Sequence, residues 1–148
     1  MFNAGNLSSA IVQMFNSDST LRSLVPGGIR YGRFLEETEP AYPYAEINVM
    51  CKGSTCNSGY LTVSNYIVTL AIYSNSSIGT TQTIGNKLGS LLDFTQINTA
   101  FSNVRVMEVV PTVDVNDNLE KSEQSRLGQD VLISKNSWRI KTLTNTGD

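Results

Sequence analysis

The absence of histidine limits the chemistry that the side chains of this chain can perform. Nucleophilic catalysis at Ser-His-Asp and Cys-His sites depends on an imidazole that accepts a proton, so both arrangements are excluded. Lysine and carboxylate bases remain available, but no pair of carboxylates falls at a convincing strand end. A hydrolase or transferase that uses Asp or Glu with a lysine is therefore kept only as an alternative.

Two further patterns resemble binding sites without meeting their requirements. The segment GTTQTIGNK, residues 79–87, places five residues between its glycines, where a P-loop has four, and an asparagine precedes its lysine. Cys51 and Cys56 are the only cysteines and would supply two of the four ligands that a zinc site needs. In a reducing compartment both stay thiols. The sequence therefore predicts no catalytic residue, no metal and no cofactor.

Three glutamates, Glu36, Glu37 and Glu39, lie close together after a predicted strand. Neighbouring carboxylates in one loop rarely enclose a cation unless further oxygen ligands follow at defined spacing. A solvated or interface-facing acidic loop is therefore favoured over a calcium site. The aromatic residues around the loop are accompanied by two arginines, Arg30 and Arg33, which favours packing on a strand face or against another protein over base stacking.

The totals describe one domain over residues 1–148 that does not bind duplex DNA stably. The chain has 11 basic and 13 acidic residues, a net charge of −2, whereas proteins held to DNA neutralise several phosphates with a clustered cationic face. No basic region precedes the first apolar residues, and no apolar run reaches the roughly 18 residues of a membrane helix. We therefore expect a protein that is made and used in the cytoplasm.

Helices are predicted where apolar residues recur at helical spacing. The first ends near Asn16, and a short turn capped by Asp18 follows it. The second main helix lies within residues 77–94, where Gly85 and Gly89 share one side and let the helix approach the sheet. The apolar residues of these segments are Leu7, Ala10, Ile11, Met14 and Phe15, then Leu21, Leu24 and Val25, then Ile84, Leu88, Leu91 and Leu92.

Strands are predicted at residues 29–34, 44–50, 60–73, 103–115 and 131–143, with residues 51–59 as a hairpin loop. The 60–73 strand is apolar on both faces and should be central. Residues 114–130 carry a net charge of −3 and should form an exposed loop or protruding hairpin. The fold class is α+β, a mostly antiparallel sheet with two main helices on one face. The expected inward residues of the last two strands are Val104, Val106, Val110, Val131, Ile133, Trp138 and Ile140.

In their order along the chain, these landmarks resemble the small tail-completion and tail-terminator proteins of tailed bacteriophages. The likeness spans residues 7–141, and the order of the elements carries it more than any one motif does. The 51–59 loop and the acidic 114–130 segment depart from the pattern. The landmarks are Asp18-x-x-Leu21-x-x-Leu24, Gly28-Ile29-x-Tyr31, YPYAEI, NYIVTLAIYS followed by a helix, and SRLGQDVLISKNSWRIK.

The resemblance implies a structural virion protein, not an enzyme, whose subunits form a ring, typically a hexamer, where the tail tube meets the head. Its partners would be further copies of itself, the tail tube protein, the head-tail connector or neck proteins and, in some tails, the sheath protein. It would assemble in the host cytoplasm. A head-closure or connector (stopper) protein of the neck and a non-viral binding module are the alternatives.

DNA must slide through such a ring, and a strongly cationic bore would retain it, so we expect an acidic or neutral lumen. Residues 131–143 are the candidate open edge for pairing between subunits. We hypothesise that the 36–43 loop, and the 114–130 segment with it, face the channel or the adjoining ring while tyrosines anchor the loop. The candidate interface residues are Arg30, Arg33, Glu36, Glu37, Glu39, Tyr42, Asp117, Glu120, Glu123, Arg126 and Trp138.

Overall fold

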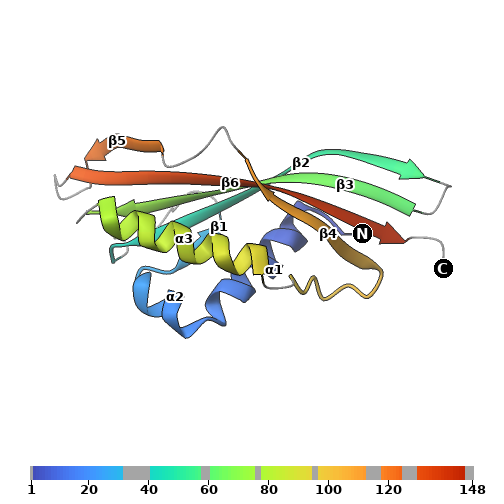
Figure 1. Ribbon diagram of the computed structural model, residues 1–148, viewed down its shortest axis with the longest axis horizontal. Helices are drawn as coiled ribbons and strands as arrows, with labels where there is room; N and C mark the ends of the chain where they lie inside the picture. The colour runs from blue at the N-terminus through green and yellow to red at the C-terminus, as the bar shows by residue number, and fades with distance from the viewer. Residues whose placement is uncertain are drawn as a thin grey trace.

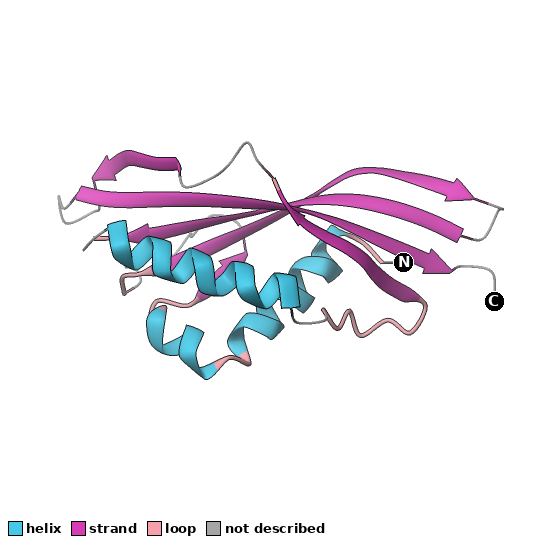
Figure 2. Cartoon of the chain, in the orientation of Figure 1, coloured by secondary structure: helices cyan, strands magenta, loops and turns pink. Residues whose placement is uncertain are grey.

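Three helices cover one face of a six-stranded sheet in the computed structural model (Figure 1). The structure describes residues 2–31, 41–57, 61–75, 78–94, 97–112, 118–124 and 130–145. The helices are α1 (Ala4–Asn16), α2 (Ser19–Leu24) and α3 (Ile78–Phe94). All three lie on the same side of the strands (Figure 2). The predicted α+β class is confirmed.

The two N-terminal helices begin where the sequence supplies caps. At the start of α1, the Asn6 N–H donates to Asn3 Oδ1 at 3.0 Å and the Asn3 N–H donates to Asn6 Oδ1 at 2.9 Å, a reciprocal capping box. At the start of α2, Asp18 Oδ1 accepts from the Leu21 N–H at 2.9 Å, as predicted. The other Asp18 oxygen lies 3.8 Å from Lys87 Nζ, which ties α2 to α3.

The sheet has the strand order β1-β2-β3-β6-β4, and β5 also pairs with β6. The β1–β2 pair is parallel and the other pairs are antiparallel. β3 is central, as its two apolar faces predicted. The strands are β1 (Ile29–Tyr31), β2 (Tyr44–Asn57), β3 (Leu61–Ser74), β4 (Val104–Pro111), β5 (Asn118–Gln124) and β6 (Asp130–Asn145).

The prediction of a loop over residues 51–59 is wrong as far as Asn57, because β2 continues to that residue beside β3. This half of β2 is rich in Ser, Gly and Thr, and its polar side chains bond across the strands. The Ser54 and Ser64 hydroxyls, for example, are 2.9 Å apart. A β-bulge between Cys51 and Gly53 takes up the extra residue, so pairing resumes after it.

The prediction that residues 131–143 form an open edge is also wrong. β6 pairs with β3 from Leu132 to Asn145 on one side. On its other side it pairs with β5 through its first half and with β4 through its second half. The last strand of the chain is therefore inserted between earlier strands, and its backbone groups are used within the subunit.

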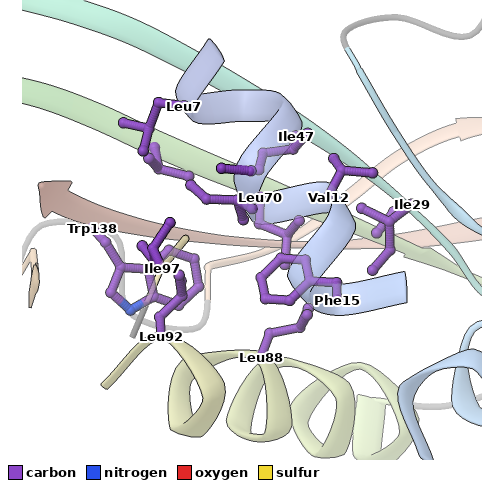
Figure 3. Close-up of a cluster of buried hydrophobic side chains, with 14 of the residues drawn as sticks. Leu7, Val12, Phe15, Ile29, Ile47, Leu70, Leu88, Leu92, Ile97 and Trp138 are labelled. Atoms are coloured by element: carbon purple, nitrogen blue, oxygen red, sulfur yellow. The ribbon is translucent and has the colours of Figure 1, made fainter. Parts of the chain in front are cut away.

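The core lies between the sheet and helices α1 and α3 (Figure 3). Phe15 and Leu88 approach each other from the two helices, and Leu70 of β3 lies beneath them at 0% exposure. In β4, Val104, Val106 and Val109 pack against this core. The predicted third contact was Val110, but a bulge between Val106 and Glu108 reverses the alternation and turns Val109 inward instead.

Candidate assembly surfaces

The sheet face opposite the helices is formed by the second set of alternating side chains. Because Val68, Leu70 and Ile72 point to the core, the intervening residues of β3 point to this outer face. The pairing registers place residues of β2, β6 and β4 beside them. No helix of the described part of the chain covers this face (Figure 2). The outer face is therefore a candidate surface for assembly.

An aromatic cluster stands at the β1 side of the outer face. The rings of Tyr44 and Tyr73 are stacked with centroids 4.7 Å apart, and Tyr42 packs on Tyr44 at 5.4 Å. The Tyr73 hydroxyl donates to Glu46 Oε2 at 3.1 Å. Arg30 of β1 is the register partner of Glu46. Of the predicted interface residues, the structure therefore brings Arg30 and Tyr42 into one cluster, where the Tyr42 ring packs at a tilt against Tyr44 of the sheet.

The charges of the outer face are mainly positive. The described side chains are those of Glu46 and Glu108 against Arg30, Arg105, Lys135, Arg139 and Lys141, a net charge of +3. The Lys141 Nζ lies 3.5 Å from Glu108 Oε2, with these side chains 44% and 52% exposed. A pair this exposed contributes less than about 1 kcal/mol to stability because solvent screens it. The described part of this face is therefore cationic overall, with Lys141 paired to Glu108.

Among the described strands, β2 beyond Ile47 and β4 each have one side without a strand neighbour, and these two sides are called the open edges. β1 pairs with β2 from Ala45 to Ile47, and no described strand pairs with that side of β2 beyond this point. β4 ends the strand order on the opposite side. Met50 is 53% exposed and Met107 is 52% exposed, and these are the large apolar side chains that the described residues expose. Each open edge therefore carries one exposed methionine.

The remaining predicted interface residues fall into two groups. Trp138 is 4% exposed and lies in the core beside Leu92 and Ile97, so its ring is not on the subunit surface (Figure 3). Glu120 and Glu123 lie in β5, where the structure gives the backbone and not the side chains. The others lie outside the described residues: Arg33, Glu36, Glu37, Glu39, Asp117 and Arg126.

Methionines Met50 and Met107 were missed by sequence reasoning, although a signal was present for Met50. It follows Glu46 and Asn48 in the polar phase of β2, where an apolar residue points away from the core. Met107 carries no such signal, because it sits at the bulge where the alternation of β4 changes phase.

Metal sites and membrane-spanning helices have structural requirements with which the described part of the chain can be compared. No group of three or more Cys, Asp or Glu side chains there is placed to hold a metal ion. The described helices include none long and apolar enough to span a bilayer. A shallow hollow of about 800 Å³ opens at one end of the sheet, between the starts of β3 and β4 and the end of β6. Its lining is mixed polar and apolar: Leu61, Ser102, Asn103, Val104, Arg105, Leu143 and Asn145.

The fold of this chain is found in solved structures, although its sequence matches no known family. No protein-family model matches the chain, and no curated protein matches it either. A chain of the virion of a native gene transfer agent (GTA) particle superposes with a TM-score of 0.74, covering 95% of this chain and 96% of that one at 13% identity. The bacteriophage SPP1 gp17 protein gives a TM-score of 0.51, with 91% and 88% covered at 15% identity. The fold is therefore shared with components of phage and phage-like particles.

Proposed function

We propose that the chain is a structural subunit of a phage or phage-like particle that forms a ring at the head-tail junction. The observation that carries the proposal is the shared fold with a virion chain over 95% of one chain and 96% of the other, at a TM-score of 0.74. The match extends over nearly all of both chains, so the likeness is not confined to one part of the fold. The order of sequence landmarks that resembles tail terminators supports the same assignment.

The ring terminates the tail tube, docks it to the head connector and leaves a channel for DNA. A hexamer formed by the single domain over residues 1–148 fits the family resemblance. Its partners are other copies of the chain, the tail tube protein and the neck proteins. The surfaces support a role in assembly, since the described residues offer open strand edges and a charged sheet face but no reactive cluster.

The described strands next to the two acidic segments support a shared role for these segments. β1, which precedes the acidic 36–39 positions, lies level with the first residues of β2. β5, which contains Glu120 and Glu123, pairs with the first half of β6. These parts of β2 and β6 flank the same end of β3. β1 and β5 therefore lie at the same end of the sheet, and the proposal puts an acidic rim, facing the channel or the adjoining ring, at this end.

The proposal is tested by mixing the full-length protein with purified tail tubes. We expect electron micrographs to show tubes with one capped end and an arrested length, and native mass spectrometry at high concentration to show a ring. If the protein binds portal or connector particles and leaves tubes uncapped, it is a head-closure protein instead. If virions contain none of this polypeptide at the junction below the head, both the terminator role and the head-closure role are excluded.

The acidic rim is tested separately by charge reversal of Glu36, Glu37 and Glu39 to lysine. Six copies of a lysine-bearing loop would hold DNA phosphates in the channel, so we expect normal ring assembly with slowed DNA ejection that recovers at higher salt. The matched control reverses Glu108, which lies on the outer face away from this rim. Unchanged ejection in the triple variant would exclude a lumen position for the loop.

A further inference from the structure

The two open edges of the sheet lie at the same level. When the strand pairings are followed across β6 and β3, Val104 of β4 is level with Cys56 of β2. In the same way, Pro111 is level with Val49. β4 is eight residues long, and it therefore spans the height of residues 49–56, which belong to the part of β2 that β1 leaves uncovered.

These edges also have opposite polarity. From β2 to β4 through β3 and β6, each neighbouring pair is antiparallel, so β2 and β4 run in opposite directions. A second copy placed beside the first by lateral continuation of the sheet keeps this polarity. Its β4 would then meet β2 of the first copy as an antiparallel neighbour, which is the arrangement of the other long pairs in the sheet.

We propose that residues 49–56 of β2 in one subunit pair with β4 of the next subunit, so that the sheet continues from copy to copy. The inference rests on the proposed ring and names the contact that closes it. Because the two edges differ, the contact is head-to-tail, the kind that closes a ring when the rotation between copies allows it. Backbone N–H and C=O groups that no described strand of the same subunit pairs with become paired across the contact.

The side chains at this contact are complementary when the copies meet without stagger. Met50 is level with Val110, so the exposed methionine of one edge meets a half-buried valine of the other. Lys52, in the bulge of β2, falls between the levels of Glu108 and Val109. A lysine is thus placed beside a glutamate, and an apolar pair lies next to it. Opposite charges across neighbouring strands stabilise pairing.

The bulges favour a second copy over an unrelated strand. Bulges generally protect open edges, because they interrupt the row of backbone groups that a foreign strand would use. Here the bulge of β2 at Lys52 and the bulge of β4 at Met107 lie at neighbouring levels of the sheet. Both edges therefore depart from regular geometry at nearly the same height. A regular strand would lose backbone hydrogen bonds at the bulge, whereas a second copy of this chain has a bulge of its own at nearly the same height.

The contact is tested by disulfide cross-linking between copies of the full-length chain. Cys51 lies on the β2 edge and is exposed, and Val109 of β4 is level with it. In a Cys56→Ser background, we expect Val109→Cys to give a ladder of linked copies on a non-reducing gel after mild copper-catalysed air oxidation of assembled rings. The matched control is Gln82→Cys on the exposed side of α3, which should give no ladder. Cysteines at Val106, Glu108 and Val110, one per variant, detect a stagger of one or more residues.

The outcomes separate this contact from the ring itself. Rings that form by native mass spectrometry while none of the four β4 cysteines links to Cys51 would overturn the contact and leave the proposed function standing. A chain that stays monomeric at high concentration and on tail tubes would overturn both. As a second measurement, Met50→Asp and Met107→Asp should each abolish the ring mass while preserving the far-ultraviolet circular dichroism spectrum. Retained rings in both variants would again exclude these edges.

Discussion

The two glycines of α3 that face the sheet should respond differently to alanine. At Gly89, an added methyl carbon would lie 3.8 Å from Trp138 Cζ2, an ordinary van der Waals distance. Alanine in a helix interior is favoured over glycine by about 0.8–1.0 kcal/mol. The new methyl group also covers part of the buried indole. We therefore expect Gly89→Ala to raise the free energy of unfolding by about 1 kcal/mol, the helix propensity term.

At Gly85 the same substitution meets a closer neighbour. The methyl carbon would lie 3.1 Å from Asn136 Nδ2 and 3.7 Å from Ile72 Cδ1. The amide nitrogen of Asn136 is buried and finds no hydrogen-bond partner among the described residues. It must move by a few tenths of an ångström, and a side chain pushed off its rotamer costs about 0.5–1.5 kcal/mol. This cost offsets the gain in helix propensity, so we expect Gly85→Ala to be neutral or destabilising.

The pair is measured by urea unfolding of the full-length protein. Trp138 is the single tryptophan and lies next to Gly89, so its fluorescence and the far-ultraviolet circular dichroism report the same transition from core and backbone. A change of 1 kcal/mol corresponds to roughly 2–4 °C in Tm for a domain of about this size. Equal stabilisation by the two substitutions would refute the close approach of α3 to Asn136. Destabilisation by Gly89→Ala would refute the room beside Trp138.

Three further predictions concern the cap, the core and alkaline pH. Asp18→Ala should cost about 1 kcal/mol by urea unfolding, because it removes the α2 cap, whereas Asp18→Asn should cost less because it can still accept the Leu21 N–H. Trp138→Ala should lower the free energy of unfolding by about 3–5 kcal/mol because the ring is buried. Met50→Ala, on the surface, should change the free energy of unfolding of the monomer little. Similar losses in the two variants would contradict the core position of Trp138. Burial raises the pKa of Tyr66 above its ordinary 10.0 in the folded protein, so the stability that the neutral ring contributes is intact below pH 10 and is lost as the pH rises through the folded pKa. The free energy of unfolding of the Tyr66→Phe variant should therefore decrease less steeply between pH 9 and 11 than that of the parent chain. The same pH dependence in the two proteins would contradict the raised pKa of Tyr66.

The spacing of apolar residues predicted the helices and strands in which that spacing stays constant from end to end. α1 and α3 each place apolar residues at helical spacing, and their predicted ends agree closely with the structure. β3 was recognised as central because both of its faces are apolar. Helical spacing and apolar strand faces depend only on residues close together in the chain, so a single sequence is enough to predict them.

The features that sequence could not predict depend on partners far along the chain. Residues 51–57 have the composition of a loop, and they form a strand because β3 offers a long edge beside them. The pattern of β6 indicates a strand but not that β4 and β5 lie along its other side. At Met107, one bulge exchanges the inward roles of Val109 and Val110. Charge and aromatic content do not tell which side of the sheet a residue occupies: of the predicted interface residues, Arg30 and Tyr42 lie on the outer face and Trp138 lies in the core.

The proposed pairing of subunits and the proposed passage of DNA together constrain which face of the sheet would meet the channel. A sheet that continues around the ring forms a wall with the helices on one side and the outer face on the other. The described outer face has a net charge of +3, and six copies of it lining a bore would retain the phosphates of DNA. On the helix side, the charged side chains described are those of Asp18, Arg22 and Lys87, and Lys87 is paired with Asp18. A ring closed through β2 and β4 that lets DNA slide would therefore turn its nearly neutral helices toward the bore and its cationic sheet face outward. The cations of β6 would then be directed to the proteins around the junction.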